Sequence, residues 1–370
     1  MEKKILSTIL FKELAIDEIL SLRDRFGYGK FSSSVSNKIS IYKMVYQTDY
    51  MGKIIEASGL IMVPSLFSKN LAIVCVQNGT TFLKSEAPTL LINHDFSGYE
   101  FFSADGYITL IPDYIGYGSS SDCIHPYYDA KHSASCVIDF ILACQDFLLE
   151  KSIPINHQLF LTGFSEGGYI TMATLKELEH HNPTIFNIEA VAAGAGGFDL
   201  FAMLHSLSNA SNSSHFQPAY IVYLIMAYNH IYQWEKPLSH YFSLPSSEII
   251  PELFNGVHDK EYINNHLGSD LSRLFNPNFY LHLFGQGELA FKKAIFLNTL
   301  SNWCPASKLN LYHGLEDDVI PYENTELTFQ KFIENGAKNT SIVLLEGLNH
   351  STTLLPMLEQ VKPWFDSLKK

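Results

Sequence analysis

The feature that most constrains the fold is a series of short, continuously apolar segments separated by helical patterns. The apolar runs occupy residues 71–76, 107–111, 158–162, 188–192, 308–312 and 341–345. Continuous rather than alternating apolarity suits strands that are buried on both faces. Helical patterns lie at about 131–150, 166–180, 323–335 and 352–368. Strands that alternate with helices predict an α/β protein, with a mostly parallel twisted sheet flanked by helices.

The N-terminal third adds elements of a different kind. Residues 10–22 carry apolar side chains at helical spacing, which predicts a short leading helix. Residues 39–46 and 54–63 alternate or run apolar around a turn at 49–52, which predicts two strands of a hairpin.

More than a hundred residues separate the predicted strand near 193 from the next one at 308. This interval is too long for an ordinary connection and must be structured. It contains the apolar, aromatic stretch 220–228 and further helical patterns. We therefore predict a catalytic domain formed by 1–199 and 300–370, with a helical cap or lid inserted at 200–299.

Composition excludes several kinds of partner. The chain carries a net charge of -13 and no run of Lys or Arg, which argues against binding to nucleic acid. Its best apolar run, Ala219 to Tyr228, is about half of the ~20 residues that span a bilayer. The five cysteines lack metal-ligand spacing, and their odd number leaves at least one free thiol. We interpret them as small buried hydrophobic residues.

The strongest motif is a G-x-S-x-G pentapeptide between the predicted strand at 158–162 and the predicted helix at 166–180, with Ser165 at its centre. Such a serine sits on a sharp, strained strand-to-helix turn that exposes its hydroxyl at the top of the sheet. Gly163 and Gly167 lack the Cβ atoms that would collide where the chain reverses. Ser165 is therefore the candidate nucleophile.

A nucleophilic serine needs a histidine base, and the base needs an orienting acid. Where the serine lies on a strand-to-helix turn of this kind, the chain order is Ser, Asp, His. His350 follows the last predicted strand, and Glu316, Asp317 and Asp318 follow the strand before it. The carboxyl ends of parallel strands meet at the edge where open α/β sheets build their sites. We predict His350 as the base and an aspartate, 317 or 318, as the acid.

Two backbone N–H groups are needed to bind the tetrahedral oxyanion. One is the N–H of Glu166, directly after the nucleophile. The loop after the strand at 71–76 is expected to supply the other, from Thr80.

The chain has 15 histidines, and most of them lack the placement of His350. We interpret as structural the histidines at 94, 125 and 313 and the adjacent pair at 180 and 181. That pair is the one metal-like feature, and neighbouring residues on a helix point about 100° apart. The sequence predicts no metal site and no cofactor.

With these residues assembled, the chain resembles the α/β-hydrolase superfamily, and within it the secreted lipase/esterase branch with a large helical cap. The resemblance includes segments 45–64 and 111–118, a His-Pro-Tyr at 125–127, and the elbow, acid and histidine loops. The superfamily pattern H-G-x-x-D-x-x-V/I-P matches residues 313–321 and favours Asp317 over its neighbour. Relatives usually have His-Gly where this chain has Asn78-Gly79.

The resemblance implies a serine hydrolase, an esterase or lipase that cleaves a small-molecule or lipid ester through an acyl-enzyme. A serine peptidase or an acyltransferase would use the same triad, whereas a non-catalytic binding protein has no need of all three residues. In the predicted cap, Tyr223 and Met226 lie off the main apolar face of the 220–228 helix. We predict that they line an acyl pocket.

No export signal is visible near the N-terminus, where Lys12 and Glu13 interrupt a short apolar run. The resemblance implies a secreted or periplasmic protein if such a signal has been removed, and a cytoplasmic one otherwise. The sequence leaves the oligomeric state open.

Overall fold

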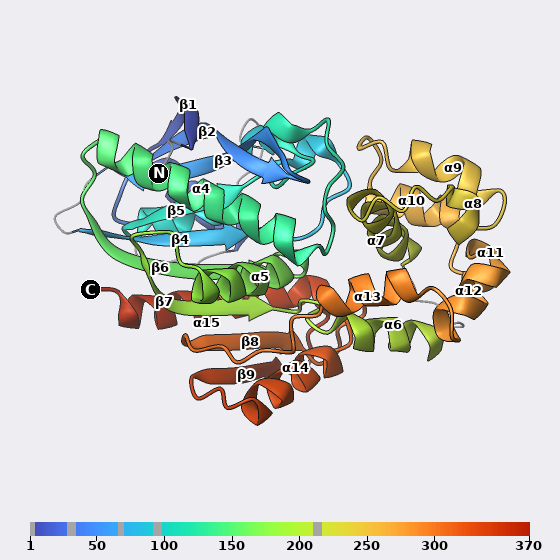
Figure 1. Ribbon diagram of the computed structural model, residues 1–370. Coiled ribbons are helices and arrows are strands. Elements are labelled where there is room, and N and C mark those ends of the chain that lie inside the picture. The colour runs from blue at the N-terminus through green and yellow to red at the C-terminus, as the bar shows by residue number, and fades with distance from the viewer. Residues whose placement is uncertain (1–3, 28–34, 66–69, 92–97, 210–216) are drawn as a thin grey trace.

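The computed structural model describes residues 4–27, 35–65, 70–91, 98–209 and 217–370 (Figure 1). In this part of the chain, nine strands form one sheet in the order β1-β2-β3-β5-β4-β6-β7-β8-β9. The strands are β1 (Ile5–Leu14), β2 (Ile39–Tyr50), β3 (Lys53–Pro64), β4 (Leu71–Gln77), β5 (Tyr107–Pro112), β6 (Ile155–Phe164), β7 (Asn187–Gly194), β8 (Leu309–Gly314) and β9 (Thr340–Leu345). The pairs from β5 through β4 to β9 are parallel, and those among β1, β2, β3 and β5 are antiparallel. The predicted α/β class with a mostly parallel sheet is confirmed.

Helices cover both faces of this sheet. The larger helices of the sheet region are α1 (Ile16–Phe26), α4 (Ala130–Glu150), α5 (Glu166–His180), α14 (Glu323–Glu334) and α15 (His350–Leu368). Short turns of helix lie at η1 (Lys84–Glu86), α2 (Pro88–Leu91), α3 (Glu100–Ala104) and η2 (Gly118–Ser120). Helices α4 and α5 pack side by side on one face, and α15 packs on β7 and β8 from the other (Figure 1).

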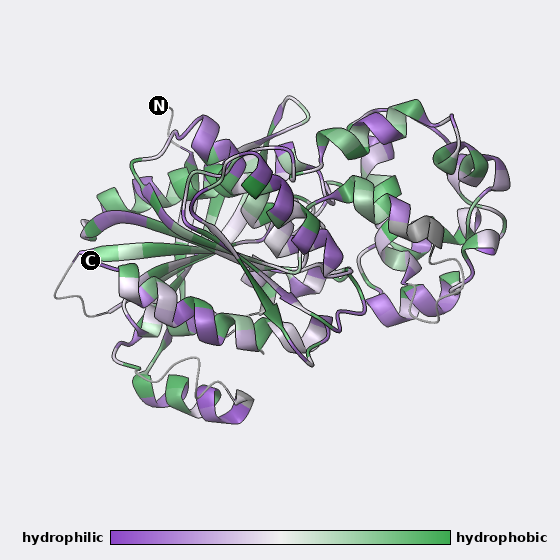
Figure 2. Cartoon of the chain, turned by 90° about the horizontal axis from the view of Figure 1, so that it is seen from below, coloured by the Kyte–Doolittle hydropathy of each residue, from purple (hydrophilic) through white to green (hydrophobic). Residues whose placement is uncertain are grey.

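The sheet is buried on both faces, as its continuous apolar runs predict. Along β4, the side chains of Leu71, Ile73 and Cys75 join the core beneath α4 and α5. The alternate residues Ala72, Val74 and Val76 join a second core beneath α15. Figure 2 shows hydrophobic residues along strands in the middle of the sheet, and both hydrophobic and hydrophilic residues along the helices around it.

The N-terminal prediction is wrong in part. Residues 5–14 form β1, an edge strand antiparallel to β2, and the helix starts only at Ile16. The apolar spacing at 10–22 runs across this boundary. Pairing with the open edge of β2 therefore outweighs the local helical pattern. The hairpin of β2 and β3 forms as predicted, with the turn at Met51-Gly52.

The interval between β7 and β8 is helical. It contains α6 (Leu200–Asn209), α7 (Pro218–Ile231), α8 (Leu238–Tyr241), α9 (Ser246–Leu253), α10 (Lys260–Leu267), α11 (Leu271–Leu274), α12 (Pro277–Phe284) and α13 (Leu289–Leu297). These helices gather beyond one end of the sheet (Figure 1). One apolar core continues from the sheet into them, through residues such as Tyr169, Tyr228 and Phe291. The division into domains at 199 and 300 stays a prediction.

Across the described ranges, α4 is the longest helix, and it forms where the helical pattern at about 131–150 predicts one. Among the described residues it is the one helix long and apolar enough to cross a membrane by length and composition. In this structure 72% of its apolar window is buried inside the protein. It packs on α5 and β2, as the core helix of a globular protein does.

Candidate active site

Ser165 lies on a strained turn between β6 and α5. Its backbone has φ 59° and ψ -126°, a region that residues with a side chain rarely adopt. A Cβ on Gly163 would collide with the carbonyl oxygen of Gly167, and a Cβ on Gly167 would collide with that of Gln77. The two glycines therefore permit the sharp reversal that places Ser165 at the carboxyl end of β6.

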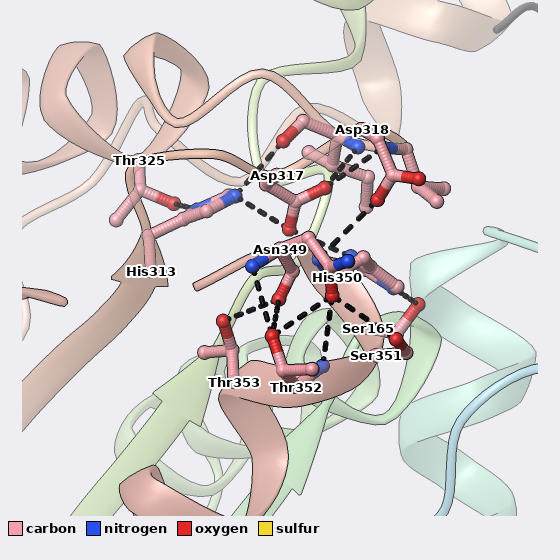
Figure 3. A network of polar contacts seen from close by, with 12 residues as sticks. Ser165, His313, Asp317, Asp318, Thr325, Asn349, His350, Ser351, Thr352 and Thr353 are labelled. Carbon is pink, nitrogen blue, oxygen red and sulfur yellow. Dashed lines mark hydrogen bonds and ion pairs between the residues drawn. The ribbon is translucent and has the colours of Figure 1, made fainter. Parts of the chain in front are cut away.

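The structure brings Ser165, His350 and Asp317 together at this edge of the sheet (Figure 3). Nε2 of His350 lies 2.9 Å from Oγ of Ser165, and Nδ1 of His350 lies 2.7 Å from Oδ2 of Asp317. A carboxylate only accepts, so Nδ1 donates and Nε2 is left to accept the proton of the serine hydroxyl. The three groups thus have the contacts of a nucleophile, a base and an acid.

Asp317, rather than Asp318, contacts the imidazole. The Asp317 side chain is fully buried, and its Oδ1 accepts the backbone N–H groups of Val319 and Ile320. Asp318 is exposed, and its carboxylate accepts only a long 3.4 Å bond from the backbone N–H of His350. Burial raises the pKa of Asp317, but hydrogen bonds from His313, His350 and the backbone outweigh it and hold that pKa well below its usual range.

The predicted oxyanion residues belong to segments next to Ser165, the first turn of α5 and the loop after β4. Glu166 is the first residue of α5, where backbone N–H groups have no partner within the helix. Thr80 lies in the loop after β4, and a Cβ on its neighbour Gly79 would lie 3.7 Å from Cβ of Ser165. The positive end of the helix dipole also favours negative charge here. Donation by these two amides stays a prediction.

His125 and His313, which the sequence analysis interpreted as structural, both contact residues of the candidate site. Nε2 of His313 lies 3.1 Å from Oδ2 of Asp317, and Nε2 of His125 lies 2.6 Å from Oε1 of Glu166. The H-G-x-x-D pattern placed His313 near the acid, and no spacing in the sequence connects residue 125 with residue 166. His94 lies outside the described residues.

The other singled-out histidines and the cysteines have no place in the site. His180 contacts the backbone of its own helix, and His181 lies 3.6 Å from Glu177. All five cysteines are free, and those at 75, 136 and 144 are buried as interpreted, but Cys123 is only partly buried and Cys304 is exposed, so the interpretation is wrong for Cys304. Across the ranges that the structure describes, no cluster of three or more His, Cys, Asp or Glu could hold a metal ion.

The helix α7 approaches the site through its aromatic side chains. The ring of Tyr223 stacks on Tyr127 at 4.8 Å and lies 5.2 Å from Phe82. The hydroxyl of Tyr223 lies 3.1 Å from that of Tyr117. Met226 is partly buried against the same apolar core. Tyr223 thus contacts the loop after β4, through Phe82, and the segment before α4, through Tyr117 and Tyr127. The acyl-binding role of Tyr223 and Met226 stays a prediction.

Solved structures with similar folds include esterases, a lipase and a putative hydrolase. A putative hydrolase from Legionella pneumophila matches with a TM-score of 0.87 at 23% identity, over 99% of this chain and 98% of its own. The rice cell wall degrading esterase LipA from Xanthomonas oryzae matches with a TM-score of 0.86 at 21% identity, over 99% and 98%. Candida antarctica lipase A matches with a TM-score of 0.71 at 13% identity, over 99% and 83%. These matches show the α/β-hydrolase fold.

Sequence comparison supplies the family. No curated protein matches the sequence significantly. The model of the secretory lipase family matches residues 83–360, which is well over half of the chain and includes Ser165, Asp317 and His350. The chain therefore belongs to the secretory lipase family and is a carboxylic ester hydrolase.

Proposed function

We propose that this protein hydrolyses esters through an acyl-enzyme formed on Ser165, with His350 as general base and Asp317 as the orienting acid. The observation that carries the proposal is the continuous series of contacts from Ser165 Oγ to His350 Nε2 and from His350 Nδ1 to Asp317 Oδ2. These distances allow proton transfer without rearrangement of the three side chains.

The reaction has two stages, formation of the acyl-enzyme and its hydrolysis, which use the same side chains. Ser165 Oγ bonds to the ester carbonyl carbon while its proton passes to Nε2 of His350, and the carbonyl π electrons move to the oxygen. The intermediate collapses, the C–O bond to the alcohol breaks, and His350 returns the proton to the departing oxygen. Water then attacks the acyl-enzyme by the same steps and releases the acid. Asp317, ionised and buried, stabilises the imidazolium that forms in each stage.

The oxyanion is proposed to bind the amides of Thr80 and Glu166. Support comes from the closeness of the 77–80 loop to Ser165 and from the position of Glu166 at the first turn of α5. Donors fixed by the backbone stabilise the charge that develops on the carbonyl oxygen, without reorganisation during the reaction.

We propose that the substrate is a lipid ester and that the helices α6–α13 form a cap over the site. The aromatic contacts among Phe82, Tyr220, Tyr223 and Phe254 support this assignment. They join the loop after β4 to α7 and to the residue that follows α9. An apolar wall of this kind suits an acyl chain better than a charged group.

A fluorophosphonate probe and a substrate panel test the proposal. The parent enzyme is expected to label once and to hydrolyse p-nitrophenyl esters, and Ser165→Ala is expected to lose both properties while remaining folded. Ser351→Ala is the control, because Ser351 is exposed beside His350 and bonds only within its own turn. Retained labelling in Ser165→Ala would place the nucleophile elsewhere. Faster turnover of amides, or transfer to added alcohols in place of hydrolysis, would favour a peptidase or an acyltransferase.

A further inference from the structure

A buried histidine–carboxylate pair lies directly beside the nucleophile. Nε2 of His125 is 2.6 Å from Oε1 of Glu166, and each side chain is only 2% exposed. Nδ1 of His125 is 2.7 Å from the carbonyl oxygen of Ile115. His125 comes from the loop before α4, and Glu166 follows Ser165 in the chain, so this contact joins that loop to the nucleophile turn.

The partners of His125 define the protonation of the pair. A carbonyl oxygen only accepts hydrogen bonds, so Nδ1 must carry a proton. If His125 were neutral and Glu166 ionised, the lone pair of Nε2 would face the carboxylate and repel it. One further proton is therefore held between Nε2 and Oε1, and the pair as a whole carries no net charge.

Two other buried histidines have different surroundings. Nε2 of His132 accepts the backbone N–H of Met51, and its Nδ1 donates to Asp129. Nδ1 of His313 contacts the hydroxyl of Thr325, which can donate. A neutral imidazole satisfies both of these sites. Of the three, His125 is the one whose two nitrogens both face acceptors.

The charge of Glu166 matters because its own backbone amide is a proposed oxyanion donor. An unpaired carboxylate on that residue would repel the negative charge that develops on the substrate oxygen, and burial strengthens such repulsion. The proton shared with His125 removes this repulsion. The hydrogen bond also fixes the Glu166 side chain at the start of α5.

The segment 125–127, which contains His125, also contacts Thr80, the second proposed oxyanion donor. The hydroxyl of Tyr127 lies 3.2 Å from Oγ1 of Thr80, and the ring of Tyr127 stacks on Tyr223 of α7. The ring of His125 itself lies 5.7 Å from that of Tyr223. Residues 125–127 therefore contact both proposed oxyanion residues and the proposed cap.

We propose that His125 is a positioning residue of ester hydrolysis, which neutralises and fixes Glu166 so that the oxyanion forms beside an uncharged side-chain pair. The inference rests on the proposed function of Ser165. His125 acts through Glu166 and has no assigned contact with the substrate.

A double-mutant cycle tests this inference. Values of kcat and KM for p-nitrophenyl acetate are measured for the parent, His125→Asn, Glu166→Gln and the double variant. His125→Asn leaves the carboxylate unpaired, so we expect kcat to fall at least about tenfold while KM changes less than about threefold. In the Glu166→Gln background, the same histidine substitution should cost less than about threefold, because no charge is left to neutralise.

A packing role would give a different result, since the loss from His125→Asn would then be equal in both backgrounds, and that outcome overturns the proposal. If His125→Asn alone does not fold, the double variant decides. If the double variant recovers folding and turnover, the proposed role of His125 in neutralising Glu166 is supported. A double variant that stays unfolded or inactive overturns that proposal.

His132→Asn is the matched control. It breaks a buried histidine–carboxylate contact of 2.7 Å to Asp129, at the start of α4. It should lower the melting temperature without lowering kcat. Ser165→Ala in the same assay distinguishes a failure of the proposed function from a failure of the proposed role of His125. If Ser165→Ala remains active, the proposed function fails, and the role of His125 fails with it. If it is inactive but the cycle shows no coupling, only the role of His125 fails.

Discussion

Nε2 of His313 lies 3.1 Å from Oδ2 of Asp317, the same carboxylate oxygen that lies 2.7 Å from Nδ1 of His350. Both the His313 and Asp317 side chains are fully buried. Nδ1 of His313 is 2.6 Å from the hydroxyl of Thr325 at the start of α14. The Asp317 carboxylate thus lies between two imidazoles, and the ring of His313 is fixed by Thr325 of α14 (Figure 3).

This relationship predicts that His313→Asn lowers kcat by roughly 10- to 100-fold, in the range of outer hydrogen-bond partners of functional groups. The physical reason is that Asp317 loses its contact with the His313 ring, whose Nε2 also lies 2.9 Å from the carbonyl oxygen of Ile320, so its carboxylate becomes less constrained. Steady-state kinetics with a p-nitrophenyl ester measure the effect, and KM should change little. His180→Asn is the control, since His180 bonds only to its own helix. An unchanged kcat in a folded His313→Asn would show that His350 and the backbone suffice to hold Asp317.

Substitution of the two adjacent aspartates, Asp317 and Asp318, should lower kcat by very different amounts. Asp317→Asn is expected to lower kcat by roughly 10⁴-fold, because an amide cannot hold the imidazole in the tautomer that accepts the serine proton. Asp318→Asn should cost less than about threefold, since this exposed side chain makes only a long bond to the backbone. Parallel kinetics of the two variants measure the ranking. The reverse ranking would assign the acid to Asp318.

Asp317 should also make the free energy of unfolding depend on pH in acidic solution. Its pKa in the folded protein lies well below the usual value, so its contribution to stability is complete above the unfolded pKa of about 4 and is lost as the pH falls toward the folded pKa. Urea unfolding of the parent and Asp317→Asn from pH 6 to pH 2.5 measures this. We expect the stability difference between them to be constant above pH 5 and to shrink below pH 4, by up to about 1.4 kcal/mol per pH unit. A difference that stays constant down to pH 2.5 would contradict this.

The sequence predicted those parts of the site that local chain geometry determines. Gly163 and Gly167 leave room for a sharp turn, and the apolar run before Ser165 marks a buried strand. Asp317 and His350 each follow such a strand, and parallel strands bring their carboxyl ends to one edge. Each of these features is indicated by a short segment of the chain around the residue concerned, so a local sequence pattern is enough to predict it.

The missed features depend on contacts between distant segments. His125 and Glu166 are 41 residues apart, and their pairing follows from the path of the loop before α4. Strand β1 forms because β2 has an unpaired edge, and its own burial pattern shows no alternation of period two. Periodicity and spacing carry no signal for either contact.

The nucleophile turn should not tolerate a methyl group at Gly167. The added Cβ would meet the carbonyl oxygen of Gln77, which belongs to the sheet backbone and cannot rotate away. We expect Gly167→Ala to destabilise the protein by about 2 kcal/mol or more, and to lower kcat as Ser165 shifts. Gly336→Ala is the control: that glycine has open space, and only its φ of 95° opposes a side chain. Its expected cost is about 1 kcal/mol, with kcat unchanged. Equal losses in the two variants, measured by denaturant unfolding, would show that the collision is relieved.

Tyr223 and Met226 are predicted to contact the acyl chain. They are three residues apart on α7, so they share one side of the helix, whereas Ile221, Leu224, Ile225 and Tyr228 are buried in the core. Each CH₂ of substrate buried against an apolar wall contributes about 0.8 kcal/mol. Values of kcat/KM for p-nitrophenyl esters from acetyl to decanoyl should therefore rise with chain length in the parent.

Substitution of either residue by Ala separates two roles of α7. If the two side chains line an acyl-binding pocket, both variants lose kcat/KM selectively for the longer esters. The slope of log kcat/KM against acyl chain length then falls. Tyr223 also stacks on Tyr127 of the turn that contacts Thr80 and Glu166, so a lost positioning contact would lower kcat/KM equally for acetyl and decanoyl esters. Met226→Ala, which leaves that stack in place, should change the slope alone. Leu281→Ala, in an exposed residue of α12, should change neither. If both α7 variants keep the parent's slope, the helix serves only as packing.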